Sequence, residues 1–237
     1  MSERWSIWID IEGFKFLHDA RNTQALLLLG RLIEDIFLIG SKVFPDDPDR
    51  LFIHQVGDGL IIVSDFMEDS LERAVAIAIV LVQSLLSYGG LARAGISSGD
   101  FADITGCYPP TIRENQNDGY LRVGRGVMSI TKVMGGALVN AFSIAHDGPS
   151  GPMIRYDLKL WDRICGLENL KTMDKTDMSI GINWYSSDVP LVDDIAKNIR
   201  ENKFEKVLLK RNLEWYLNEF DSQLSENWKS TARKILL

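Results

Sequence analysis

Apolar and polar residues alternate along the first part of the chain in a pattern that predicts regular elements in a definite order. Residues 5–10 alternate β-prone side chains and predict a strand. Residues 14–39 carry apolar side chains three and four positions apart, which predicts a long helix with one buried face. Gly40 and Pro45 then predict the end of this helix. The chain therefore begins with a strand followed by a helix.

A hairpin and a second helix are predicted next. Two apolar runs, residues 51–56 and 60–64, flank a turn of sequence Gly-Asp-Gly, which is typical of a β-hairpin. Residues 68–88 are rich in Ala, Ile and Leu and predict a helix, and residues 91–97 predict a fourth strand. The order strand, helix, strand, strand, helix, strand is that of the ferredoxin-like split βαβ fold. The expected fold class is α+β, a mixed and largely antiparallel sheet with helices on one face.

The second half of the chain is less regular. Glycine, asparagine and two adjacent prolines predict a loop over residues 101–125, with one short strand at 120–123. Further elements are expected in this order: a helix over 127–145, strands over 152–156 and 179–184, and a charged helical tail over 192–237.

Composition limits the class of protein. With 237 residues, 46% of them hydrophobic, the chain can bury a sizeable core. We expect one main domain over residues 1–185 and a helical tail, residues 186–237, packed on it. The net charge of -7, from 26 Lys and Arg against 33 Asp and Glu, provides no basic stripe for a nucleic-acid backbone. Nucleic acid is therefore not an expected partner.

The cysteines and the apolar runs favour a cytoplasmic protein. Cys107 and Cys165 are isolated in the sequence, so neither a zinc site nor a disulfide is expected. The most apolar run, residues 74–82, is about half as long as a membrane span requires, and residues 1–10 lack the features of a secretion signal. Neither membrane insertion nor secretion is expected.

Two carboxylates are predicted to meet at one edge of the sheet. In the split βαβ topology the third strand lies beside the first, so Asp10 at the end of strand one should lie near Asp58 in the hairpin turn. Neither has a Lys or Arg adjacent in sequence, so the two repel unless a cation joins them, and oxygen ligands suit Mg²⁺ or Mn²⁺. Two such metals stabilise the attacking and leaving oxygens of a phosphoryl transfer.

The turn after Asp10 predicts an anion site beside this metal site. Because it opens a helix, the N–H groups of residues 12–15 should be free to face a triphosphate. The residues expected to bind nucleotide here are Glu12, Gly13, Phe14 and Lys15. Lys15 adds a cation that is unfavourable for the helix itself, which favours a functional role.

Three segments of the chain resemble class III adenylate and guanylate cyclases. Residues 8–14 (Trp-Ile-Asp-Ile-Glu-Gly-Phe) resemble the first metal-binding segment of that family, and residues 56–59 (Val-Gly-Asp-Gly) resemble the second. Residues 93–99 (Arg-Ala-Gly-Ile-Ser-Ser-Gly) are similar to its strand-four signature. All three occur in family order, which is more specific than any one segment. The resemblance implies a cyclase core that closes a nucleoside triphosphate into a 3′,5′-cyclic monophosphate.

The resemblance also implies roles for individual residues. Asp10 and Asp58 would be catalytic and bind two Mg²⁺ or Mn²⁺ ions with the main-chain carbonyl of Ile11. Arg93 would hold the triphosphate, and Gly57 would lie beside the nucleotide.

A further segment, residues 135–140, is similar to the family segment whose asparagine orients the ribose from the partner protomer. That asparagine corresponds to Asn140. The family builds its sites at a two-fold interface, so the expected assembly is a homodimer with active sites at the interface.

Two departures from the family pattern affect catalysis and base choice. The arginine that stabilises the transition state falls four residues after the asparagine, where this chain has Ile144. Either another cation replaces it or catalysis is impaired. The replacements considered are Arg122, Arg125 and Lys132.

The second departure lies in the base pocket. The purine-reading position holds His54, and its usual partner position holds Val133, which offers no hydrogen bond to a purine. This altered pocket resembles the Pycsar pyrimidine cyclases of bacterial antiphage defence, where an aromatic ring narrows the same position. The resemblance implies a pyrimidine substrate, with UTP favoured over CTP. The alternatives are a purine cyclase with unusual base contacts and an inactive homologue that binds nucleotide and signals.

Each residue also has an ordinary structural explanation. Asp58 suits a hairpin turn, Asp10 suits the start of a helix, and Asn140 is tolerated on a solvated helix face. Arg93 could extend from a sheet edge into solvent, and His54 could be a hydrogen-bonded histidine of the core. Only the predicted meeting of the two carboxylates favours the functional explanation.

Overall fold

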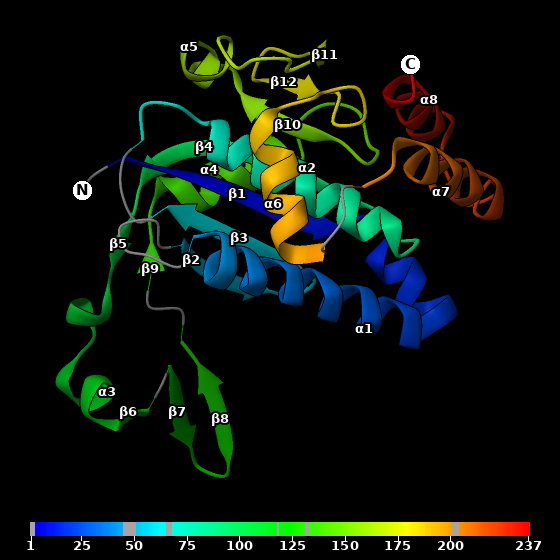
Figure 1. The fold of residues 1–237 in the computed structure, drawn as a ribbon. Coiled ribbons are helices and arrows are strands. Elements are labelled where there is room, and N and C mark those ends of the chain that lie inside the picture. Colours follow the sequence, from blue (N-terminus) through cyan, green and yellow to red (C-terminus); the bar gives the residue numbers. More distant parts are fainter. Residues whose placement is uncertain (1–2, 45–50, 65–67, 118, 131–132, 201–203) are drawn as a thin grey trace.

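The computed structural model describes residues 3–44, 51–64, 68–117, 119–130, 133–200 and 204–237. Its largest unit is a seven-stranded sheet with helices packed on it, and a slender arm projects away from this body (Figure 1). No helix within these ranges is both long and apolar enough to cross a membrane.

The first six main elements confirm the predicted order. They are β1 (Glu3–Ile11), α1 (Phe14–Leu38), β2 (Leu51–Val56), β3 (Gly59–Ser64), α2 (Glu72–Ser87) and β4 (Ala92–Asp100). The end of α1 differs slightly from the prediction, because the chain continues from Leu38 into a π-helical turn, Ile39–Val43. Arg21 has non-helical backbone angles and kinks α1, which its sequence did not indicate.

The strand order of the large sheet is β11-β12-β10-β4-β1-β3-β2. β1 lies between β4 and β3 and runs antiparallel to both. β2 also runs antiparallel to β3, so β3 lies between two parallel strands, as the split βαβ topology requires. The registers of these pairs decide which side chains of β1 meet their neighbours at the end of the strand.

The two faces of the sheet are covered by different helices. Side chains alternate along β1, so Ile7 and Ile9 join the main core with α1 and α2, while Trp8 joins a smaller cluster with Ala141 and Ala145. These two alanines belong to α4 (Gly136–Ala145). The expected fold class is confirmed: α1 and α2 of the βαββαβ core cover one face, and α4, which follows that core, packs on the opposite face.

Glycine in β4 makes the close approach of α4 possible. A Cβ atom on Gly95 would lie 2.3 Å from the carbonyl oxygen of Ala141 and from the amide nitrogen of Ala145. Since real side chains do not reach such distances, any larger residue here would push the helix off the sheet. α4 is thereby held against the face that carries Asp10.

The segment between β4 and α4 forms the projecting arm (Figure 1). Its short elements are β5 (Ala102–Asp103), α3 (Pro110–Asn115), β6 (Gln116–Asn117), β7 (Tyr120–Val123), β8 (Gly126–Ser129) and β9 (Val133–Met134). The short strand at 120–123 is confirmed. The predicted helix over 127–145 is wrong in its first part, because Gly124, with φ of 61°, turns the chain back into a hairpin. The helix begins only at Gly136.

The remaining elements extend the sheet and add the tail. They are β10 (Ile154–Asp157), α5 (Trp161–Ile164), β11 (Thr172–Lys175), β12 (Ser179–Ile182), α6 (Pro190–Arg200), α7 (Lys206–Glu219) and α8 (Glu226–Ile235). Strands near 152–156 and 179–184 and a helical tail are confirmed, whereas β11 was not predicted. α6 packs against α2, and Ile195 and Ile199 of α6 are buried in the main core.

Candidate functional site

The strand registers bring Asp10 and Asp58 to the same end of the sheet. Asp10 pairs across the strands with Gly59, the residue directly after Asp58. The hairpin turn is formed by Gly57 and Asp58, and Gly57 has φ of 66°, a backbone conformation that favours glycine. Gly59 leaves room for the indole of Trp8, since a Cβ atom there would lie 2.3 Å from that ring.

Arg93 is bound to Asp10. The two residues are cross-strand partners on β4 and β1, and Arg93 Nε donates to Asp10 Oδ1 at 3.0 Å. Burial tends to lower the pKa of Arg93, but the hydrogen bond to Asp10 and the charges of Asp10, Glu12 and Asp58 raise it above its ordinary value. The expectation that Asp10 lacks a neutralising cation is therefore wrong, because the cation comes from a neighbouring strand rather than from adjacent sequence.

Glu12 lies beside this ion pair with its side chain largely buried. Its Oε1 accepts a hydrogen bond from Trp228 Nε1 at 3.0 Å, and its Oε2 lies 3.5 Å from Arg93 Nε. Burial raises the pKa of Glu12, against the lowering effects of Arg93 and Trp228. Its backbone N–H donates to the carbonyl of Leu91 at 2.9 Å, so the expectation that this amide is free to face a phosphate is wrong.

The other residues of the turn lie where the sequence predicts. Gly13 caps α1 in the left-handed conformation, with φ of 73°. Phe14 is the first helical residue, and the side chain of Lys15 is exposed in the first turn. Ile11 is the last residue of β1, paired with Ala92 of β4.

His146 is a site residue that sequence reasoning missed. It follows the last turn of α4, and its Nε2 lies 3.8 Å from Asp10 Oδ2. Its Nδ1 lies 2.8 Å from the carbonyl oxygen of Phe142, so in the neutral ring Nδ1 carries the proton and Nε2 presents a lone pair to the site. Nothing near His146 in the sequence marks it, because the contact depends on α4 crossing β1.

His54 lies on β2, across from Ile61 of β3. It is half-buried, and burial lowers its pKa. Its Nε2 is buried and has no hydrogen-bond partner among the residues that the structure describes. An unpaired buried ring nitrogen is a group that a ligand can satisfy.

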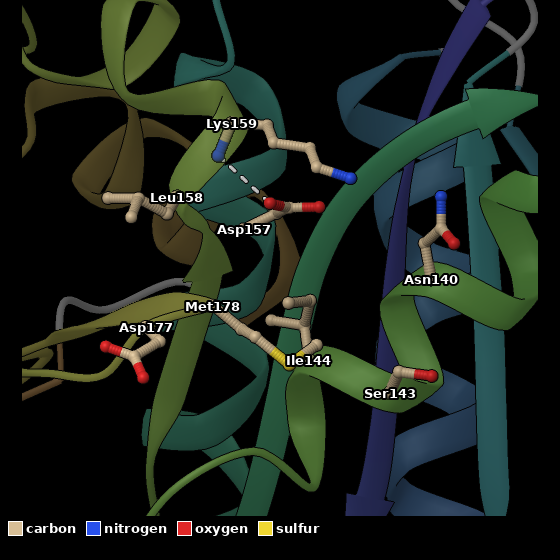
Figure 2. A pocket seen from close by; sticks show the side chains of 8 residues that line it. All are labelled: Asn140, Ser143, Ile144, Asp157, Leu158, Lys159, Asp177 and Met178. Atoms are coloured by element: carbon tan, nitrogen blue, oxygen red, sulfur yellow. Dashed lines mark hydrogen bonds between the residues drawn. The ribbon is translucent and has the colours of Figure 1, made fainter.

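Asn140 and Ile144 line a separate cavity of about 320 Å³ between α4 and the ends of β10 and β12 (Figure 2). Asn140 Nδ2 donates to the carbonyl of Ser98 at 3.0 Å, and Ile144 is 2% exposed. Lys159 lines the same cavity, and in Figure 2 its side chain extends towards Asn140. The backbone N–H of Lys159 donates to the carboxylate of Asp157, which fixes the position of the Lys159 backbone.

Solved structures with the same fold are guanylyl cyclase domains. No family profile and no curated protein sequence matches the chain. The guanylyl cyclase domain of the RhoGC fusion protein from the aquatic fungus Blastocladiella emersonii matches with a TM-score of 0.53 and 14% identity, over 76% of this chain and 93% of that one. A structure of that domain described as a noncanonical dimer matches with a TM-score of 0.51, the same identity and the same coverage.

This chain has the fold of a guanylyl cyclase domain.

Within that cyclase fold, neither of the two described cations considered as replacements for the family arginine lies at Ile144. Arg122 lies on β7, and Arg125 lies in the turn of the arm hairpin. Lys132 is outside the described residues. Lys159, which sequence reasoning did not consider, shares the cavity with Ile144.

The ligands implied by the sequence resemblance are oxygen donors, which suit Mg²⁺ or Mn²⁺. The described part of the chain contains no cluster of three or more Asp, Glu, His or Cys side chains that could hold a metal ion. The predicted set needs only two carboxylates, Asp10 and Asp58, with the Ile11 carbonyl, and all three are oxygen donors at one sheet edge. Arg93 and a cation bound at Asp10 would compete for the same carboxylate.

Proposed function

We propose that this chain is a nucleotidyl cyclase that converts a nucleoside triphosphate into its 3′,5′-cyclic monophosphate and pyrophosphate. The observation that carries the proposal is the register of β1 and β3, which pairs Asp10 with the neighbour of Asp58 in a cyclase fold. Asp10 and Asp58 would hold two divalent cations with the Ile11 carbonyl. When bound, such cations neutralise the charge that develops on the phosphates.

The proposed reaction needs groups that this chain can supply. The ribose 3′ oxygen forms a bond to the α-phosphorus, the bond from that phosphorus to the pyrophosphate oxygen breaks and releases pyrophosphate, and the 3′ hydroxyl passes its proton to His146 Nε2 or to water. Arg93 would bind the departing phosphates after leaving Asp10, and Asn140 would orient the ribose. His146 Nε2 lies near enough to Asp10 to accept a proton from a group bound there.

We infer a pyrimidine substrate, UTP in preference to CTP. The support is His54, a ring at the position expected to read the base, whose buried Nε2 is unpaired in the described structure. Val133 supplies no hydrogen bond to a larger base. A purine cyclase with altered base contacts is the alternative substrate class.

We propose that the working form is a homodimer with active sites at the interface. The arm supports this, because Tyr120 and Val127 are each more than half exposed and lie on the same face of one hairpin. The related fungal domain has been solved both as a monomer and as a dimer. Sedimentation of the purified chain tests this assembly.

The resemblance to Pycsar enzymes leads us to propose that the cyclic product is a second messenger in antiphage defence within the cytoplasm. Bacteria expressing the chain with its neighbouring genes should resist phage, and the Asp58→Ala variant should not.

The substrate assay tests the activity directly. Purified protein is incubated with each of the four nucleoside triphosphates and Mn²⁺, and the products are separated by chromatography. Cyclic UMP as the main product supports the whole proposal, cyclic AMP or GMP supports the purine alternative, and no cyclic product contradicts the cyclase proposal.

A second candidate function is a nucleotide-binding signalling domain without turnover. Two observations favour it: Arg93 occupies Asp10, and the arginine position of the family holds the buried residue Ile144. This candidate predicts that nucleotide raises the melting temperature of the protein although no product forms.

A further inference from the structure

The C-terminal helices reach the candidate site, although they are more than 200 positions away in sequence. Trp228 of α8 is 4% exposed and donates its Nε1–H to Glu12 Oε1, 216 positions earlier. The ring of Tyr216 from α7 stacks on Trp228 with centroids 5.9 Å apart. The hydroxyl of Tyr216 lies beside Gly13, since a Cβ atom there would be 3.4 Å from it. The tail thus packs directly on the turn that follows Asp10.

One carboxylate oxygen of Glu12 accepts a hydrogen bond and the other does not. Trp228 occupies Oε1, whereas Oε2 is buried and accepts no hydrogen bond within the described structure. Its only described ionic contact with an arginine, to Arg93 Nε, is too long for a hydrogen bond, and a buried acceptor left without a hydrogen bond is costly. The nearest cation is Arg93, whose Nε lies 3.5 Å from Oε2 and 3.0 Å from Asp10 Oδ1.

Arg93 therefore has a second carboxylate within reach. A cation that binds Asp10 competes with Arg93 for its carboxylate, and a guanidinium that yields in a partly buried site needs another anionic partner. Glu12 Oε2 can accept it without a large movement, because Trp228 already fixes the carboxylate with this oxygen turned to Arg93. The hydrogen bond from the indole N–H of Trp228 to Oε1 therefore fixes the position of Oε2, the oxygen that is left to accept Arg93.

We propose that Trp228 is a positioning residue of the candidate site, which holds Glu12 as the acceptor for Arg93 when a divalent cation binds Asp10 in the nucleotide-free protein, before the phosphates of a nucleotide engage the guanidinium. The inference rests on the proposed function, because it requires cation binding at Asp10. It assigns the tail to the metal site rather than to packing alone. Trp228 contacts neither substrate nor metal and acts through Glu12 and Arg93.

The test is a double-mutant cycle on cation binding, read without turnover. Mn²⁺ is titrated into the full chain and free Mn²⁺ is measured by electron paramagnetic resonance. Trp228→Phe keeps the ring packing but removes the N–H, and it should weaken Mn²⁺ binding about tenfold, the usual effect of losing a residue that orients a ligand shell. In an Arg93→Met background the same change should have no effect, because the residue that needs the vacant acceptor is gone.

Trp215→Phe is the matched control. Trp215 lies on α7, is 41% exposed and packs on Phe220, away from Glu12, so its change should leave Mn²⁺ affinity unaltered. An equal loss from Trp228→Phe with and without Arg93, or no loss in either background, overturns the proposal. A wild-type chain that binds no Mn²⁺ overturns it together with the two-metal function.

Hydrogen exchange in metal-free protein distinguishes a failure of this inference from a failure of the proposed cyclase function. Trp228→Phe should raise exchange at the Glu12 amide, which is bound to Leu91, whatever the fate of the cyclase proposal. Unchanged exchange there shows that the tail does not hold the turn and contradicts the inference by itself.

Discussion

The two halves of the candidate site differ in how firmly their side chains are held. At the end of β1, Asp10, Arg93 and Glu12 are linked by contacts of 3.0 and 3.5 Å, and Trp228 anchors them from the tail. Around α4, the family arginine is missing, and Lys159 projects into an open cavity. The half at the end of β1 has the residues that the sequence resemblance implies, and further side-chain contacts hold them in place. The half around α4 has Ile144 where that resemblance implies an arginine. This contrast indicates that more side-chain contacts hold the carboxylate end of the site than hold the α4 end.

The largest expected effect is at the end of the site that holds Asp10 and Asp58, where we propose that cations bind. Asp58→Ala should lower cyclase activity roughly a thousandfold or more, since a cation ligand contributes several kcal/mol to the transition state. It should change the free energy of unfolding by less than about 0.5 kcal/mol, because a turn carboxylate contributes little to the core. Activity assays and urea denaturation check both. Asp162→Ala, an exposed carboxylate on α5, is the control.

An Asp58→Ala variant that keeps activity, or one that loses its fold, would show that this carboxylate serves the turn alone.

The next effect is at the α4 cavity. If Lys159 supplies the cation that Ile144 lacks, Lys159→Ala should lower kcat roughly a hundredfold, the usual cost of removing one group that stabilises developing charge. Lys159→Arg should restore most of the rate. Lys197→Ala, an exposed lysine on α6, is the matched control. Equal rates for the Lys159→Ala variant and the wild type would leave the α4 half without a catalytic cation.

A smaller effect distinguishes the two roles of Arg93. Arg93→Met frees Asp10, so Mn²⁺ should bind the nucleotide-free protein more tightly, by about threefold to tenfold. The same variant should raise KM for the nucleotide, because the triphosphate loses a cation. Calorimetry and steady-state kinetics measure the two changes. Weaker Mn²⁺ binding in this variant would mean that Arg93 supports the cation site rather than competing for it.

The smallest effect concerns pH and His54. Burial lowers the pKa of His54 in the folded chain, so the unfolded chain binds its proton more readily. The contribution of His54 to stability is therefore present above its ordinary pKa, about 6.5, and is lost as pH falls below it. The free energy of unfolding should fall less between pH 7 and pH 5 in His54→Gln than in the wild type. Parallel curves from denaturant titrations would place His54 in solvent.

The sequence predicts the metal half of the site better than the rest. The alternation of residues 5–10 and the Gly-Asp-Gly turn specify strands whose topology brings Asp10 beside Asp58, so local pattern was enough. The Asp10 to Arg93 pair depends on the register of β1 and β4, which no local pattern gives. His146 approaches Asp10, and Trp228 contacts Glu12, only because helices distant in sequence pack on this end of the sheet. No local sequence pattern gives that packing either.

The arm shows where apolar spacing misleads. Residues 127–134 have apolar residues at a spacing that a helix would also show, yet β8 is exposed along its length. A helix in this segment would have no core to pack on. The left-handed backbone conformation of Gly124 allows a tight turn, and the segment forms a hairpin instead.

The central claim is that Asp10 and Asp58 hold a shared cation, and a crystal structure grown with Mn²⁺ and a non-hydrolysable nucleoside triphosphate tests it most directly. The account predicts anomalous density about 2.1 Å from a carboxylate oxygen of each residue, with Arg93 turned away from Asp10. Density at any other place, with Arg93 still on Asp10, would contradict it.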